Sequence, residues 1–161
     1  MIFATTGTQL PFPRLIAALD ALAPGLGEPV IAQVGPDPAA YRNLETHATL
    51  TPGRFDTLFA EARIVVAHAG IGTILSARRH GRPLILVPRR LNHGEHRNDH
   101  QLATARELEQ RAGLSVAWQV EDLAAMLHGP TPEPGSTASD AAPDTPLERL
   151  RTHLRGLVDG A

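Results

Sequence analysis

The polar stretch from residue 92 to residue 101 holds the side chains best suited to chemistry. It combines imidazole, carboxylate and amide groups, which are His93, Glu95, His96, Asn98, Asp99, His100 and Gln101. Such groups can read sugar hydroxyls, transfer protons or bind a metal ion. The stretch is therefore the first candidate for a functional site.

The three histidines of this stretch suggest a metal site only under one assumption. Their spacing of i, i+3 and i+7 would place His93, His96 and His100 on one face of a continuous helix. Gly94 and the pair Asn98–Asp99 indicate instead a loop followed by a capped helix, which breaks the common face. We therefore expect no metal. A solvated polar loop stays open as an alternative, but we favour recognition of hydroxyls.

A glycine-containing turn follows the apolar run at residues 64–67, which is too short for a helix and predicts a buried strand. Its polar and small residues are His68, Gly70, Gly72 and Thr73. A helix that begins here, at or near Thr73, offers free backbone N–H groups and a positive dipole end, which suit phosphate. Arg89 and Arg90 lie on the loop after the next predicted strand, and we expect Arg89 to help bind the substrate. A plain tight turn with a structural histidine is the alternative.

A second polar turn contains Gly7 and Thr8 and follows a predicted strand at residues 1–6. If the sheet is parallel, this turn lies at the same edge as the turn after residue 67, where ligands of open α/β sheets collect. The alternative is a polar turn that only starts the next helix.

Alternating strands and helices must position these loops. Apolar runs predict strands at residues 1–6, 30–34, 64–67, 84–87 and 114–120, with a weaker one near 48–51, and helical periodicity predicts helices near 13–22, 55–62, 73–81, 102–111 and 121–127. This order is typical of an α/β protein. We expect one Rossmann-like domain with a doubly wound, mainly parallel sheet.

Composition divides the chain into three parts. Residues 1–128 form the predicted domain, residues 129–146 hold five prolines and predict a flexible linker, and residues 147–161 carry leucines at helical spacing. That helix could fold back on the domain or dock on a partner.

The formal charge of −2 argues against nucleic-acid binding, and the lack of cysteine excludes disulfides and thiolate chemistry. Without a signal peptide or a long apolar run, we expect a cytoplasmic chain.

Three motifs carry a resemblance to a known family: HAGIGT, GRPLILVPRR and GEHRNDHQLATA. Together they resemble the C-terminal half of MurG-like glycosyltransferases of family 28, and most closely the small exopolysaccharide glycosyltransferase subunits of the PssE and EpsF type. The likeness is close over residues 64–105, looser over 1–63, and fades after about residue 112. It implies one half of a GT-B enzyme, which binds the nucleotide-sugar donor.

The resemblance also implies roles for individual residues. The HAGIGT turn would place His68, Gly70, Gly72 and Thr73 against the diphosphate of a UDP-sugar, with help from the loop of Gly7 and Thr8. The pair His100–Gln101 matches the family's pair at the sugar end, with Glu95, Asn98 and Asp99 as neighbours. No metal or other cofactor is implied, since fixed donors can stabilise the UDP leaving group.

Two features depart from a complete family member. Many relatives carry a ribose-binding glutamate eight residues after the position of His68, and here that position is Ser76. A complete GT-B enzyme also has a second domain for the acceptor. The resemblance therefore implies a membrane-anchored, acceptor-binding partner subunit, a lipid-linked sugar acceptor, and a location at the inner face of the membrane. The catalytic base stays unassigned, with Glu95 and His96 as candidates.

The predicted function is an inverting, metal-independent UDP-sugar glycosyltransferase subunit for exopolysaccharide or lipid-linked glycan assembly. A nucleotide-sugar epimerase or hydrolase with a histidine-rich cleft is the alternative enzyme. A non-catalytic subunit that stabilises its partner is the third hypothesis.

Overall fold

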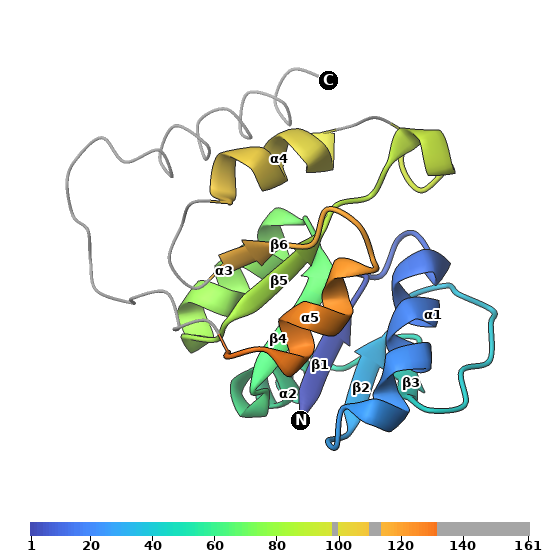
Figure 1. Cartoon of the computed structure of the whole chain (residues 1–161), viewed down its shortest axis with the longest axis vertical. Helices are drawn as coiled ribbons and strands as arrows, with labels where there is room; N and C mark the ends of the chain where they lie inside the picture. Colours follow the sequence, from blue (N-terminus) through green and yellow to red (C-terminus); the bar gives the residue numbers. More distant parts are fainter. Residues whose placement is uncertain (98–99, 110–113, 132–161) are drawn as a thin grey trace.

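A computed structural model describes residues 1–97, 100–109 and 114–131. Its centre is a six-stranded sheet in the order β3-β2-β1-β4-β5-β6, and every neighbouring pair is parallel (Figure 1). The strands are β1 (Ile2–Thr5), β2 (Val30–Gln33), β3 (Glu45–His47), β4 (Ile64–His68), β5 (Leu84–Val87) and β6 (Leu114–Val116). The predicted α/β class and parallel sheet are confirmed.

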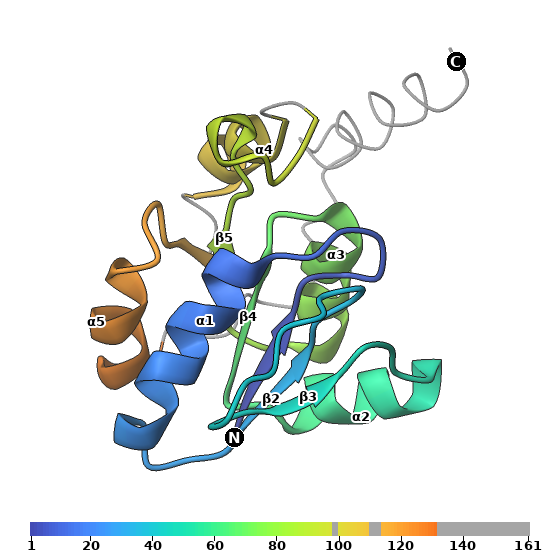
Figure 2. The same cartoon turned by 90° about the vertical axis from the view of Figure 1, so that its right-hand side faces the viewer.

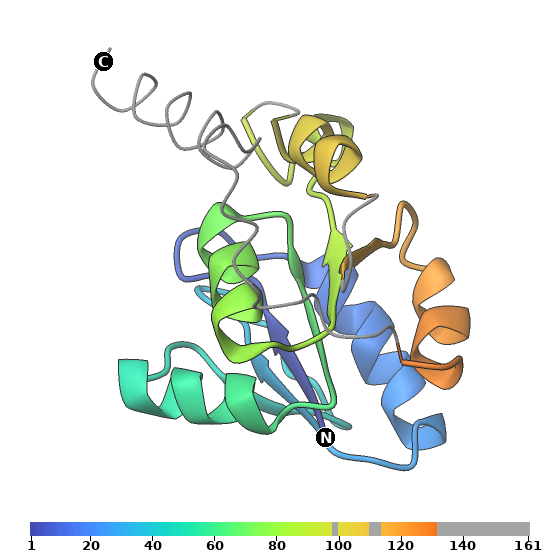
Figure 3. The same ribbon diagram turned by 90° about the vertical axis from the view of Figure 1, so that its left-hand side faces the viewer.

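Helices cover both faces of the sheet. They are α1 (Pro13–Leu22), α2 (Pro52–Glu61), α3 (Ile71–His80), α4 (His100–Leu108) and α5 (Asp122–His128), with short 3-10 turns η1 (Ala23–Gly25) and η2 (Leu91–His93). Figure 2 shows α1 and α5 on one face and α2 and α3 on the other, while α4 lies beyond the carboxyl ends of the strands. Figure 3 shows the same layers from the opposite side. The sheet is therefore doubly wound.

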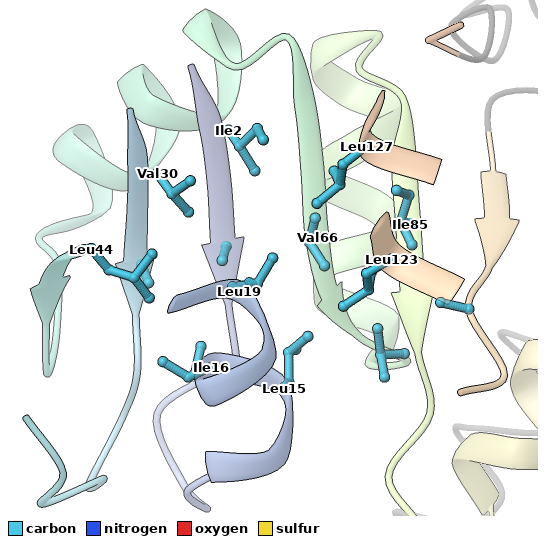
Figure 4. Packing of buried hydrophobic residues seen from close by; sticks show 14 of the residues in the cluster. Ile2, Leu15, Ile16, Leu19, Val30, Leu44, Val66, Ile85, Leu123 and Leu127 are labelled. Carbon is cyan, nitrogen blue, oxygen red and sulfur yellow. The ribbon is translucent and has the colours of Figure 1, made fainter. Parts of the chain in front are cut away.

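The two faces of the central strands explain the two layers. Side chains alternate between faces along a strand, so Ile2 packs with α1 and α5, whereas Phe3 packs with α2 and α3. Figure 4 shows the first of these clusters, where Leu15 and Leu19 of α1 and Leu123 of α5 meet the sheet. Because strands buried on both faces carry near-continuous apolar runs, the central strands were predictable from sequence.

The strand order reverses between β1 and β4, which lie side by side at the centre of the sheet. Chains leave these two strands toward opposite faces, because α1 follows β1 and α3 follows β4 (Figure 2). Ligands of open α/β folds bind in the crevice outside such a switch point. The loops after β1 and β4 are therefore placed where a ligand would bind.

Several predicted boundaries differ from the structure. The weak strand predicted near 48–51 is wrong: β3 comprises Glu45–His47, paired with Ile31–Gln33, and Thr51 caps α2. The last strand ends at Val116 rather than at residue 120, because the chain turns into α5. Helix α3 begins at Ile71, with Gly70 rather than Thr73 at its start. Gly81 ends it in a left-handed conformation, as predicted.

The predicted C-terminal parts mostly lie outside the described residues. The structure describes only residues 129–131 of the predicted linker, and the predicted helix at 147–161 is outside it, so both stay predictions. In the described part of the chain, no helix has the length and apolar character needed to cross a bilayer.

Candidate functional site

A cavity of about 130 Å³ opens at the carboxyl edge of the sheet. Four separate segments build it: the loop after β1, the end of β4, the loop after β5, and the first turn of α4. Its lining residues are Thr6, Gly7, Thr8, Gln9, Leu10, His68, Arg89, His96 and Gln101. A larger cavity of about 290 Å³ between α5 and strands β5 and β6 is lined mainly by apolar groups, so the polar chemistry belongs to the smaller one.

His68 is the last residue of β4, and its ring packs closely against Gly7 and Gly70. A side chain at either position would crowd the ring. A Cβ at Gly70 would lie 2.3 Å from His68 Nε2, and one at Gly7 would lie 3.1 Å from Cε1. Gly7 also has φ of +77°, in the left-handed region that favours glycine. Both glycine-containing turns predicted from sequence therefore meet around one imidazole.

The imidazole of His68 is neutral near pH 7. Burial, and then the nearby charge of Arg89, lower the pKa of His68 to about 4. Its Nδ1 lies 3.4 Å from the Thr5 carbonyl oxygen, which can only accept a hydrogen bond, so Nδ1 carries the proton. Nε2 is then free of a proton, and it lies over Gly70 at the start of α3.

The first turn of α3 lacks a side-chain cap. Gly70 precedes the helix in an extended conformation and has no side chain to accept from the N–H groups of Ile71, Gly72 or Thr73. A Cβ at Gly72 would meet nothing within 4 Å, so the space beside Gly72 is open. Free N–H groups and the positive end of the helix dipole suit an anion at this position. Ser76 is half-buried in the second turn.

Arg89 lies beneath the cavity and is only 2% exposed. Its two terminal nitrogens donate to the carbonyl oxygens of Thr6, Leu10, Pro11 and Glu95, and its guanidinium lies 4.6 Å from the ring centroid of Phe12. Burial lowers the pKa of Arg89 to about 10, so it stays charged at neutral pH. It thus supplies a fixed positive charge at the floor of the cavity.

Glu95 is held by two arginines. Arg14 of α1 donates to both carboxylate oxygens at 2.6 and 2.9 Å, and the backbone N–H of Arg90 donates at 2.9 Å. Burial alone would raise the pKa of Glu95, but the hydrogen bonds from Arg14 and Arg90 outweigh it, and the net pKa is lowered. An ionised, fully engaged carboxylate is a weak proton acceptor, which disfavours Glu95 as a base.

The other predicted residues divide between the cavity and its surroundings. His96 and Gln101 line the cavity, whereas His93 and His100 have exposed side chains. Gln101 accepts a 3.1 Å hydrogen bond from the Arg89 N–H through its amide oxygen, so its NH₂ group is the part a ligand would meet. Asn98 and Asp99 lie outside the described residues.

The assumption of a helical histidine face is wrong. Turn η2 ends at Gly94, which has φ of +68°, and α4 begins only at His100. Among residues 1–97, 100–109 and 114–131, no group of three or more histidine or acidic side chains is arranged to hold a metal ion.

Sequence reasoning missed Arg14 and the role of Phe12. Arg14 pairs with a carboxylate 81 residues away, and Phe12 stacks against both Arg14 and Arg89. The one available signal was an arginine in the first turn of a predicted helix, where acidic residues are favoured. Such a charge reversal indicates a partner elsewhere in the fold.

Comparisons with known proteins identify the family of the chain. Residues 1–138 match the family model described as the glycosyltransferase family 28 C-terminal domain. A relative from Granulibacter bethesdensis, a UDP-N-acetylglucosamine--N-acetylmuramyl-(pentapeptide) pyrophosphoryl-undecaprenol N-acetylglucosamine transferase, is 37% identical over 129 residues. The match covers 74% of this chain but 32% of that protein, so the chain spans about a third of the relative's length.

Two solved structures share the fold. Streptomyces sp. SF2575 glycosyltransferase SsfS6, complexed with thymidine diphosphate, is similar at a TM-score of 0.57 and 23% identity, over 80% of this chain and 32% of that one. The solution structure of ALG13 is similar at 0.59 and 17% identity, over 92% of this chain and 93% of that one. With the family model matched over residues 1–138, these findings confirm the resemblance: the chain belongs to glycosyltransferase family 28 and is a MurG-like GT-B C-terminal domain.

Proposed function

We propose that this chain is the donor-binding half of an inverting UDP-sugar glycosyltransferase that acts in exopolysaccharide or lipid-linked glycan assembly. The observation that carries the proposal is the uncapped first turn of α3, which lies beside His68 and the two glycine-containing loops. The relative from Granulibacter bethesdensis is a UDP-sugar transferase, and SsfS6 was solved with a nucleoside diphosphate, which supports a nucleotide-sugar ligand.

The diphosphate of the donor would bind at the start of α3. The N–H groups of Ile71, Gly72 and Thr73 would donate to its oxygens, with Gly7 and Thr8 closing over it from the loop after β1. As the glycosidic bond breaks, negative charge grows on UDP, and donors already held in place stabilise that charge without reorganising. We therefore propose metal-independent binding and no other cofactor.

The sugar would lie toward α4. The NH₂ group of Gln101 would donate to a sugar hydroxyl, and His100, with Asn98 and Asp99 before it, would contribute further contacts. Of the two candidate bases, we favour His96, because it lines the cavity while Glu95 is engaged by Arg14. The acceptor hydroxyl must still be brought close to the anomeric carbon by another protein surface.

That surface would belong to a partner subunit. The chain spans about a third of the UDP-sugar transferase it resembles, whereas it spans 93% of ALG13, a chain of comparable size with this fold. We propose a membrane-anchored, acceptor-binding subunit with a lipid-linked sugar as acceptor. This chain would then act at the inner face of the membrane through that partner, and the predicted helix at 147–161 is one candidate docking segment.

Calorimetry tests the donor site. Purified protein titrated with UDP, and with a panel of nucleotide sugars, should bind uridine nucleotides equally well with and without EDTA. The ligand should also raise the melting temperature, because it binds only the folded state. Absence of binding by any uridine nucleotide at millimolar concentration would overturn the proposal, and binding that EDTA abolishes would overturn its metal-independent form.

Partner dependence needs a separate assay. Turnover of a UDP-sugar onto a lipid-linked acceptor should be very low with the purified chain and should appear when the acceptor-binding subunit is added. Efficient turnover by the chain alone would contradict the half-enzyme proposal and would direct attention to His96 and Glu95 as bases.

A further inference from the structure

Arg89 has a hydrogen-bonding pattern that differs from that of a phosphate-binding arginine. An arginine that binds phosphate presents its guanidinium fork to the anion. Here the two terminal nitrogens make four hydrogen bonds to backbone carbonyl oxygens, at 2.5 to 3.3 Å. The side chain is 2% exposed and stacked on Phe12. Its donors are therefore engaged with the protein at the floor of the cavity.

The carbonyl partners of Arg89 come from both sides of the proposed donor site. Thr6, Leu10 and Pro11 belong to the loop that carries Gly7 and Thr8, and Glu95 belongs to the loop after β5. The backbone N–H of Arg89 also donates to Gln101 at the start of α4. One residue thus connects the wall at the diphosphate end to the wall at the sugar end.

The charge of Arg89 is not neutralised by direct contact. In the described part of the chain, no carboxylate lies within ion-pair distance of its guanidinium, and Glu95, the acid whose charge acts on it, pairs with Arg14. A buried cation bonded to neutral carbonyls leaves a positive potential in the cavity above it. An anionic ligand would be attracted without touching the arginine.

We propose that Arg89 is a positioning residue and not a phosphate ligand: its guanidinium joins the loop of residues 6–11 to the Glu95 carbonyl, its backbone N–H binds Gln101, and these bonds set the spacing between the diphosphate and sugar ends of the site. This inference rests on the proposed donor site. It predicts that the planar fork matters as well as the charge, because a lysine ammonium offers three donors around one atom and cannot reach four carbonyls spread over two loops.

Two substitutions separate geometry from charge. Arg89→Lys keeps the charge, whereas Arg89→Met leaves an apolar side chain without the charge or the donors. Both should weaken UDP binding in calorimetry by at least about tenfold, and both should shift the amide signals of Gly7 and Thr8 in NMR spectra of the free protein. The matched control is Arg63→Met.

Arg63, like Arg89, makes several hydrogen bonds, but it pairs with a carboxylate and lies at the opposite edge of the sheet. It precedes β4 and bonds to Glu28, to Thr131 Oγ1 and to the Leu127 carbonyl. Arg63→Met should lower the melting temperature and leave the affinity of the folded protein for UDP unchanged. Because this control also removes an arginine with several hydrogen bonds, it shows the result expected of a purely structural arginine: a lower melting temperature with unchanged UDP affinity.

A wild-type measurement serves even where an Arg89 variant does not fold. The Nη–H signals of Arg89 should exchange slowly because of burial, and saturating UDP should leave them nearly unmoved while it shifts the Gly72 amide. Large UDP-induced shifts of the Nη–H signals would make Arg89 a direct ligand and overturn the inference. Full wild-type affinity in Arg89→Lys would also overturn it, by showing that charge alone suffices. If wild-type protein binds no uridine nucleotide at all, the proposed function itself fails, which is a distinct result.

Discussion

Helices α2 and α3 start in contrasting ways on the same face of one sheet (Figure 2). Both have ten residues, and each carries glycine at its second position, Gly53 in α2 and Gly72 in α3. In α2, the Thr51 side chain accepts from the Arg54 N–H, and Pro52 removes a further N–H from the first turn. In α3, Gly70 provides no such cap.

The difference lies also in what surrounds each helix start. The first residues of α2 are exposed, whereas α3 begins beside His68, the loop of Gly7, and the buried charge of Arg89. A helix dipole is common to both, so the dipole alone does not make a site. Of the two, only the helix start that lies among several loops, that of α3, lacks a capping side chain. A bound anion there would accept the hydrogen bonds that a cap would otherwise accept.

The largest expected effect comes from Gly70→Ala. The new Cβ would lie 2.3 Å from His68 Nε2, so the ring must leave its place over the start of α3. We expect a loss of about 1–3 kcal/mol in the free energy of unfolding from overpacking and loss of measurable UDP binding. Denaturant titration and calorimetry check the two effects, with Gly53→Ala as the control that keeps UDP binding. Wild-type affinity of Gly70→Ala for UDP would show that His68 does not contribute to the site.

The fold was largely predictable because its central strands are buried on both faces and read as apolar runs. The edge strand β3 was misplaced because its residues Glu45 and Thr46 are exposed and polar. The site was only partly predictable. Glycines next to a strand end indicate a turn from sequence alone. The sequence around Arg89, by contrast, gives no sign that this arginine is buried, because it follows Val87 and Pro88 at the end of a strand, where an exposed arginine is equally common. Its burial depends on carbonyls some 80 residues earlier in the chain, so only the fold reveals it.

The next effect concerns pH. The pKa of His68 is about 4 in the folded protein and near its ordinary value of 6.5 when unfolded, so the unfolded state binds more protons between these values. Stability contributed by His68 is therefore present above about pH 6.5 and is lost as pH falls toward 4, by about 1–3 kcal/mol. Urea titrations from pH 7 to pH 4.5 should show this loss in wild type.

His68→Gln is the control for the pH effect, because glutamine has no proton to gain. Its stability should vary less over the same range. The carboxylates with lowered pKa values, Glu28, Asp56 and Glu95, lose their contribution at lower pH and act alike in both proteins. Parallel pH profiles for the two proteins would show that His68 is not held neutral.

A smaller effect separates the two glycines at the second helix positions. Neither Gly72→Ala nor Gly53→Ala meets an atom within 4 Å, so each should change stability by no more than about 1 kcal/mol. Only Gly72→Ala should weaken UDP binding, by roughly fivefold or ~1 kcal/mol, because its methyl group approaches the phosphate. Equal UDP affinities of the two variants would place the diphosphate elsewhere.

The smallest effect is expected at the cap of α2. Thr51→Ala removes the acceptor of the Arg54 N–H and should lower the free energy of unfolding by about 1 kcal/mol. UDP affinity should not change, since α2 starts away from the cavity. A drop in affinity that exceeds the stability effect would mean that the two helix starts are coupled, and would weaken the contrast drawn between them.

The most direct test of the donor site is an NMR titration of the ¹⁵N-labelled chain with UDP in the presence of EDTA. The amide signals of Ile71, Gly72 and Thr73 should shift together and saturate, because UDP binds at the uncapped turn of α3 without a metal. The signals of Gly53 and Arg54 in α2 should stay in place. Saturating shifts confined to another part of the chain, or shifts that require a divalent metal, would contradict the account.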